Sequence, residues 1–292
     1  YLKKNKPWIR FGISPAGVAA SQKAVADKYG VTPCPGSDWQ YNKIFSDPLA
    51  WLSEGSIDFI SPQVYWEIGY QVADFGKITP WWYTVSAKFR RHCYISQSLS
   101  RYTGAADLGE LENEMELVRT SDTDEAPGFV YFPWKQILNL RARVDGKLTD
   151  LPVALRRTIY PQKSLTPRLS WVEAPYPGTA TNVSRSGREL TWSGPDNVRF
   201  TVYAVPNSVD KAAFKKDAQY LIGNSYGKSF TISEKDIPTA SLNTYNYAVA
   251  VLDRYGNEYS AVFEGAAVTE GQKPALTYPA NGSSAPEGFR FA

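Results

Sequence analysis

The sequence predicts an α/β domain with a parallel sheet, followed by an all-β domain that forms an antiparallel sandwich. The length of 292 residues fits about two domains of roughly 150 residues each. In the first half, short apolar runs alternate with helical patterns, which is typical of βα units and a parallel sheet. Beyond Trp171 the apolar residues recur at every second position, which indicates antiparallel strands.

The composition excludes several classes of function. Hydrophobic residues make up 43% of the chain, which is enough for a packed core, so disorder is not expected. The net charge of +3 comes without a basic block, so nucleic acid and anionic membranes are not indicated as partners. No apolar run is long enough for a membrane span. The only histidine is His92 and the only cysteines are Cys34 and Cys93, so no zinc or haem spacing exists and no cofactor is expected. We interpret His92, at the start of a predicted strand, as structural or exposed, and whether the cysteines pair stays open.

The first elements are a strand, a loop and a helix. Residues 8–15 (WIRFGISP) predict a strand that its final proline ends. In the long loop that follows, Trp39 and Tyr41 are candidates for stacking on a sugar ring, or equally for holding the loop to the protein body. Asp47 and Pro48 predict a helix start, because an N-cap acid and a proline at the first helical position are both favoured.

Residues 57–67 (IDFISPQVYWE) carry most of the functional prediction. An apolar run, typical of a strand buried on both faces, ends in Gln63, Tyr65, Trp66 and Glu67. Such a change at a strand's carboxyl end is how an α/β barrel presents its active site. The amide and phenol groups suit sugar hydroxyls, and the indole suits the face of a sugar ring. The simpler interpretation is a strand that ends in an aromatic cluster.

Further βα units follow. Residues 78–91 show a helical pattern, residues 92–97 predict a strand that ends in Gln97, and residues 128–134 predict another strand. An apolar stripe with three- or four-residue spacing predicts a helix through Leu108, Leu111, Met115 and Val118. We interpret the acids between them as a solvated helix face: Glu110, Glu112, Glu114 and Glu116.

The second half predicts a sandwich of about 100 residues, which we place at residues 171–270. Its alternating segments are residues 188–193, 198–205, 228–232 and 245–252. Residues 254–258 (RYGNE) predict a hairpin turn into a strand at 259–263. Residues 271–292 are rich in Pro, Gly and Ser and predict a loose tail.

Several motifs, in order, resemble those of a known family. Residues 6–15 (KPWIRFGISP) are similar to its motif K-P-W-[VI]-[KR]-F-G-I-S-P, and residues 51–66 to its motif W-L-x-E-G-x-I-D-[YF]-[IV]-x-P-Q-x-Y-W. Residues 94–97 and 128–132 fall where its last two barrel strands fall. Over residues 1–165 the chain thus resembles the glycosyl hydrolase-like 10 family of secreted lipoproteins. The following region resembles, more weakly, the fibronectin-type-III-like domain that trails this barrel in Bacteroides-type proteins.

The resemblance implies a (β/α)8 TIM barrel that hydrolyses glycosidic bonds in extracytoplasmic polysaccharide, with bacterial members linked to peptidoglycan glycan. The strands of this chain correspond to strands five to eight of that barrel. The first four strands, with the family's acidic strand-end motif, are missing. We therefore expect the C-terminal half of a barrel, either in a fragment of a longer protein or completed by another copy. The resemblance also implies the periplasm or the cell surface, with a lipid anchor at a missing N-terminus.

The predicted site combines one acid with sugar-contacting groups. Glu67 is the candidate catalytic residue, and we expect the missing half to supply at least one catalytic acid, because glycoside hydrolysis usually needs two carboxyl groups. The candidate substrate-binding residues are Ser14, Gln63, Tyr65, Trp66 and Gln97. The expected partner is a polysaccharide or oligosaccharide. The alternatives are a non-catalytic carbohydrate-binding protein and a structural role in which the sandwich is a spacer.

Overall fold

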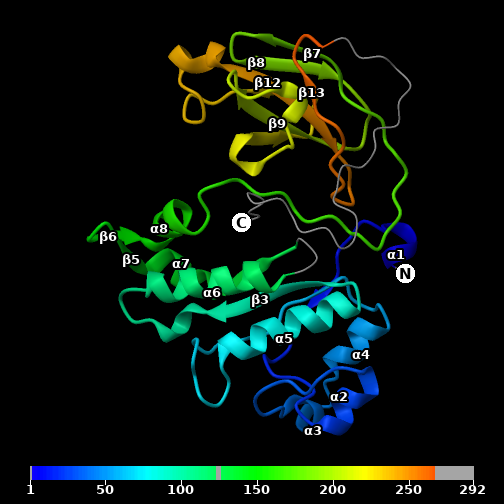
Figure 1. Cartoon of the computed structure of the whole chain (residues 1–292), viewed down its shortest axis with the longest axis vertical. Helices are drawn as coiled ribbons and strands as arrows, with labels where there is room; N and C mark the ends of the chain where they lie inside the picture. The colour runs from blue at the N-terminus through cyan, green and yellow to red at the C-terminus, as the bar shows by residue number, and fades with distance from the viewer. Residues whose placement is uncertain (1, 123–125, 267–292) are drawn as a thin grey trace. The chain divides into compact units, whose positions relative to one another are not determined.

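The computed structural model describes residues 2–122 and 126–266, which form two compact units (Figure 1). The first unit extends to Pro161, and the second begins at Gln162. Each unit has an apolar core of its own. The loose tail predicted at residues 271–292 lies outside the described residues.

The first unit is built on a four-stranded parallel sheet. Its strands follow one another in chain order: β1 (Gly12–Ile13), β2 (Phe59–Ile60), β3 (His92–Ser98) and β4 (Gly128–Phe132). Because all four are parallel, their carboxyl ends lie at one edge of the sheet. The predicted parallel sheet is confirmed, whereas its assignment to half of a barrel stays a prediction.

Helices connect these strands, and three of them begin at an aspartate whose side chain accepts a backbone N–H. These are α4 (Pro48–Ser53) at Asp47, α5 (Phe75–Lys88) at Asp74 and α6 (Leu108–Ser121) at Asp107. The described residues of this unit also form α1 (Leu2–Asn5), α2 (Lys23–Tyr29), α3 (Gln40–Ile44), η1 (Leu99–Arg101), α7 (Trp134–Asn139) and α8 (Leu151–Thr158).

The core of the first unit lies between the sheet and the helices α5 and α6. Trp82 of α5 is fully buried, and its indole N–H donates to the carbonyl of Gly17 at 2.7 Å. On α6, Leu111, Met115 and Val118 are buried, as their spacing predicts. Trp82 therefore ties the helix layer to the segment that leaves β1.

The other face of the sheet carries aromatic rings that lie over glycines. A methyl group at Gly12 would come within 2.3 Å of the Phe59 ring, and one at Gly128 within 2.0 Å of the Tyr94 ring. The two rings pack together with their centroids 5.1 Å apart. Both positions need glycine because any larger side chain would displace a ring.

Several elements of the first unit were not predicted. The clearest is a hairpin of β5 (Arg141–Val144) and β6 (Lys147–Asp150). Its two turn residues, Asp145 and Gly146, have φ values of 50° and 75°, as a type I′ turn requires. In addition, β1 is shorter than the predicted strand at residues 8–15, since ladder pairing covers only Gly12–Ile13.

The second unit consists of two antiparallel sheets. The first has the order β10 (Leu221–Ser225), β9 (Arg199–Pro206), β12 (Tyr245–Leu252), β13 (Val262–Phe263), and the second β11 (Ser229–Thr231), β8 (Glu189–Ser193), β7 (Thr181–Ser186). Short 3-10 turns are η2 (Lys211–Ala213), η3 (Ala218–Tyr220) and η4 (Thr239–Thr244).

Residues of both antiparallel sheets share one core, so the sheets pack face to face. Trp192 of β8, Phe200 of β9 and Tyr247 of β12 all belong to it. The antiparallel sheets confirm the prediction in this coarse form, although β7 and β10 were not predicted. The likeness to a fibronectin-type-III domain stays a prediction.

The two cysteines, Cys34 and Cys93, are buried free thiols, and both lie in the first unit. Burial raises the pKa of the Cys34 thiol to about 12, and it also raises the pKa of the Cys93 thiol strongly. They do not form a disulfide in this structure.

No helix within residues 2–122 and 126–266 is both long and apolar enough to cross a membrane. Nor do the described residues gather three or more His, Cys, Asp or Glu side chains in a group that could hold a metal ion.

Candidate functional site

Ser14 and Gln63 meet at the carboxyl edge of the parallel sheet. The Gln63 amide donates from Nε2 to the backbone oxygen of Ser14 at 3.1 Å and to its hydroxyl at 3.4 Å. Gln63 also forms isolated parallel β-bridges, with Ala16 on one side and with Ser96 on the other. The ends of three neighbouring strands are thereby held together, with the exposed Ser14 hydroxyl at the rim.

Tyr65 contributes an aromatic surface together with a residue that the sequence analysis did not select. Its ring stacks on that of Phe132, with centroids 6.2 Å apart and planes 7° from parallel. Phe132 ends β4 and remains 52% exposed. Half-buried rings of this kind can receive the apolar face of a sugar. The available signal for Phe132 was its place near the end of the strand predicted at residues 128–134.

Trp66 is partly buried and packs against the core of the first unit. Gly17 lies directly beneath it. A methyl group at Gly17 would come within 2.4 Å of the Gln63 carbonyl oxygen and 2.9 Å of the Trp66 ring. The absence of a side chain at Gly17 is therefore what lets the segments after β1 and β2 lie so close together.

We expect Gly17→Ala to destabilise the protein by about 1–3 kcal/mol, because the added methyl group must push a backbone carbonyl away. Thermal unfolding measures this loss. Gly109→Ala is the matched control, since its methyl group would find its nearest neighbour at an ordinary 3.5 Å. Equal melting temperatures for the Gly17 variant and the unmodified chain would contradict the close approach.

Glu67 is exposed and follows Trp66 at the rim. Its backbone oxygen accepts from the amides of Tyr70 and Phe75, each at 3.3 Å. These bonds close the turn that leads into α5 and leave the Glu67 side chain at the surface. It is the one carboxylate among the predicted site residues.

Gln97 lies beneath this rim and has no exposed surface. Its Nε2 donates to the backbone oxygen of Trp66 at 3.2 Å and to Glu114 Oε1 at 2.7 Å. The backbone N–H of Ser98 donates to its Oε1 at 2.7 Å. Both the nitrogen and the oxygen of the amide are therefore bonded to protein groups, and a contact of Gln97 with substrate stays a prediction.

Glu114 corrects the interpretation of the α6 acids. The four were expected to form a solvated face, and Glu112 and Glu116 are indeed exposed, but Glu114 is 0% exposed. It faces Gln97 because it shares the apolar stripe, three residues after Leu111. That spacing was the signal that could have identified it.

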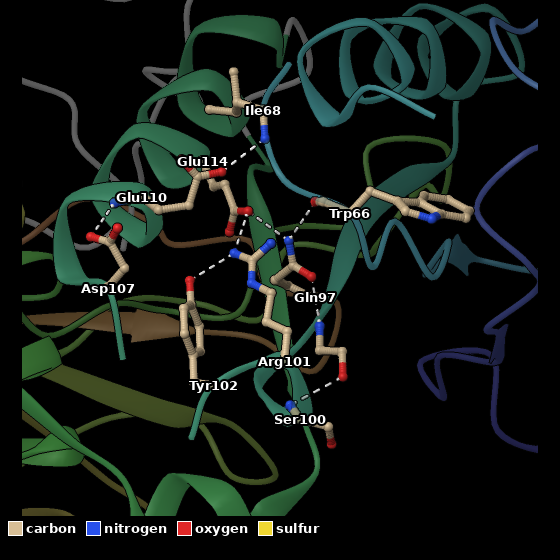
Figure 2. A network of polar contacts seen from close by, with 10 residues as sticks. Trp66, Ile68, Gln97, Ser100, Arg101, Tyr102, Asp107, Glu110 and Glu114 are labelled. Atoms are coloured by element: carbon tan, nitrogen blue, oxygen red, sulfur yellow. Dashed lines mark hydrogen bonds and ion pairs between the residues drawn. The ribbon is translucent and has the colours of Figure 1, made fainter. Parts of the chain in front are cut away.

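Arg101 pairs with Glu114 inside the same cluster (Figure 2). Its Nη2 donates to Glu114 Oε1 at 2.7 Å and to the Tyr102 hydroxyl at 2.8 Å. Burial raises the pKa of Glu114 to about 8, an effect that outweighs the opposing influence of Arg101 and Gln97. A buried acid with such a pKa can change its protonation state near neutral pH.

Three other residues considered in the sequence analysis differ in their exposure to solvent. Trp39 precedes α3 and is more than half exposed, while Tyr41 packs against the core. His92 is buried, and a ring nitrogen lies 3.0 Å from the Tyr94 hydroxyl. His92 is thus structural rather than exposed.

Comparison with known proteins places most of the rim within a stretch that matches a family model. The family model described as Glycosyl hydrolase-like 10 matches residues 1–106. Residues 1–106 are thus similar to the glycosyl hydrolase-like 10 family. The match includes all the predicted site residues of the rim and ends before α6 and β4.

Two glycosyl hydrolases are similar to this chain over different lengths. The chain is 28% identical to glycosyl hydrolase YngK of Bacillus subtilis (strain 168) over 269 residues, which cover 89% of this chain and 50% of YngK. It is 30% identical to glycosyl hydrolase DigH of Escherichia coli (strain K12) over 97 residues, which cover 32% of this chain and 20% of DigH. The chain thus spans about half the length of YngK.

Proposed function

We propose that this protein takes part in the hydrolysis of glycosidic bonds in extracytoplasmic polysaccharide, with the glycan strands of peptidoglycan as the first substrate to test. The observation that carries the proposal is the rim itself. Ser14, Gln63 and Tyr65 lie in the stretch that matches the glycosyl hydrolase-like 10 model, and Phe132, from β4 beyond it, stacks on Tyr65, so that all four residues lie at the carboxyl ends of parallel strands. Hydroxyl and amide groups beside an aromatic surface are the groups that bind sugars.

In this proposal Glu67 acts as the general acid that protonates the leaving oxygen of the glycosidic bond. A second carboxyl group is required, about 5 Å away in a retaining enzyme or about 6.5–9.5 Å away in an inverting one. We propose that it comes from outside the four-stranded sheet. The partly exposed face of that sheet, where Phe132 and Val130 remain accessible, is where further barrel strands would pack.

The alternative is a protein that binds carbohydrate without cleaving it. It is favoured by one specific observation: Glu67 is the single carboxylate among the rim residues identified above, whereas the sugar-contacting groups are several. The same hydroxyl, amide and aromatic groups would serve binding alone. The composition of the rim does not distinguish a hydrolase from a protein that only binds carbohydrate, so an experiment has to distinguish them.

We expect Glu67→Gln to lower kcat for glycan cleavage by about 10²–10⁴-fold, the usual contribution of a general acid. Gln63→Ala should raise KM several-fold with a smaller change in kcat, because it removes a group that orients Ser14 at the rim. The measurement is the release of reducing ends from soluble peptidoglycan glycan strands. Glu112→Gln, an exposed acid on α6, is the matched control.

Unchanged rates in both variants would remove this strand end from the mechanism. Saturable binding of the glycan strands, without cleavage by the unmodified protein, would instead favour the carbohydrate-binding alternative.

A further inference from the structure

The backbone on both sides of Glu67 is held through α6, directly by Glu110 and, by way of Gln97, by Glu114. On the carboxyl side, the N–H of Ile68 donates to Glu110 Oε1 at 2.8 Å. On the amino side, the carbonyl of Trp66 accepts from Gln97, whose same nitrogen donates to Glu114. Figure 2 shows both anchors, with the Trp66 carbonyl toward Gln97 and its indole pointing away from the cluster.

The orientation of Gln97 makes the second anchor specific. Its Oε1 accepts the backbone N–H of Ser98 at 2.7 Å. Its Nε2 must therefore point to the two acceptors, the Trp66 carbonyl and Glu114. A flipped amide would place an oxygen against both acceptors and would also face the Ser98 N–H with a donor.

Glu114 is held in turn by Arg101 of η1, the short helix that follows β3. Arg101 donates to the same oxygen, Oε1, at 2.7 Å, and its guanidinium lies 4.9 Å from the centre of the Tyr102 ring. A charged donor and an amide donor on one buried oxygen leave the Glu114 side chain little freedom. Glu110 and Glu114 are four residues apart and thus lie on the same side of α6, which faces the segment at residues 66–68.

We propose that Glu110 and Glu114 are positioning residues that together fix the backbone on either side of Glu67. The inference rests on the proposed function for the role of Glu67, but the anchoring itself can be measured without any substrate. Neither acid touches the rim, so each acts through the segment that it holds. A general acid needs such a fixed backbone because small displacements from the reacting oxygen cost large factors in rate.

Amide hydrogen exchange in the full chain tests the anchoring. We expect Glu110→Ala to speed exchange at the Ile68 amide about tenfold, the effect of losing one hydrogen bond. Glu114→Ala should speed exchange in the same segment, and Glu114→Gln should restore most of the protection, since its side-chain oxygen can still accept from Gln97. Glu112→Ala, on the exposed side of the same helix, should leave the segment unchanged.

Kinetics distinguish positioning from general stability. With peptidoglycan glycan strands as the probe, Glu110→Ala and Glu114→Ala should lower kcat about tenfold or more with little change in KM, and Glu114→Gln should recover most of kcat. Amide hydrogen exchange in α5 measures whether the overall fold is intact. Glu110 is only partly buried, so Glu110→Ala leaves no cavity in the core.

The two proposals fail separately. Unchanged exchange at Ile68 in Glu110→Ala would overturn the anchoring, whether or not the glycan is cleaved. Faster exchange in the variants, combined with no cleavage by the unmodified protein, would support the anchoring and overturn the hydrolase proposal.

Discussion

The free energy of unfolding is expected to fall by a few kcal/mol as the pH rises from about 5 to about 8, and Glu114→Gln should remove most of that slope. Burial raises the pKa of Glu114 from its ordinary value of 4.5 to about 8 in the folded protein. Between these two values the folded protein holds a proton that the unfolded chain has released. Stability therefore decreases with pH across this window and levels off above about pH 8.

Urea denaturation at a series of pH values measures this effect. The groups that face Glu114 are Gln97 of β3, Arg101 of η1 and Glu110 of its own helix, and Glu110 raises the pKa of Glu114 further. Glu116→Gln is the control, because Glu116 is exposed and should leave the pH slope as it is. If Glu114→Gln and the unmodified protein show parallel pH profiles, the carboxyl group is not protonated in this window.

The second large effect is expected for Trp82→Ala, which should destabilise the first unit by about 3–5 kcal/mol. The side chain is fully buried, and its removal also leaves the Gly17 carbonyl without the indole donor at 2.7 Å. Trp82→Phe keeps most of the apolar volume and loses that hydrogen bond, so a loss of about 1–2 kcal/mol is expected.

Trp134 provides the matched control for this prediction, because it is 68% exposed on α7. Trp134→Ala should change stability by no more than about 0.5 kcal/mol. Denaturation curves of the three variants give the comparison. Similar losses for Trp82→Ala and Trp134→Ala would show that the core does not lie between α5 and the sheet.

Local signals predicted the elements that depend on neighbouring residues. Asp47 and Pro48 predicted the start of α4, and the stripe through Leu111 and Val118 predicted the buried face of α6. Asp145 and Gly146 form an equally local turn signal between β5 and β6, although no hairpin was predicted there. The short strand β1 differs because pairing across the sheet, not composition, decides where a strand begins.

The positions of the candidate site residues at strand ends were predictable from the sequence, but the burial of their side chains was not. The motif at residues 57–67 indicated that Gln63 and Tyr65 lie at a strand end, and the structure brings Gln63 to Ser14 there. The sequence around Gln97 did not indicate that its side chain turns toward α6. Successive strand residues point to opposite faces of the sheet, so a shift of one residue changes the face that a side chain occupies. The role of Phe132 depends on tertiary packing, since its stacking partner Tyr65 is distant in sequence.

The two buried thiols give this protein a built-in reporter. Thiolates, not thiols, react with alkylating reagents, and burial keeps Cys34 and Cys93 in the thiol form. Both lie in the first unit, and the chain contains no other cysteine. The rate of iodoacetamide labelling in the intact chain is therefore expected to report the transient opening of the first unit, where both thiols lie.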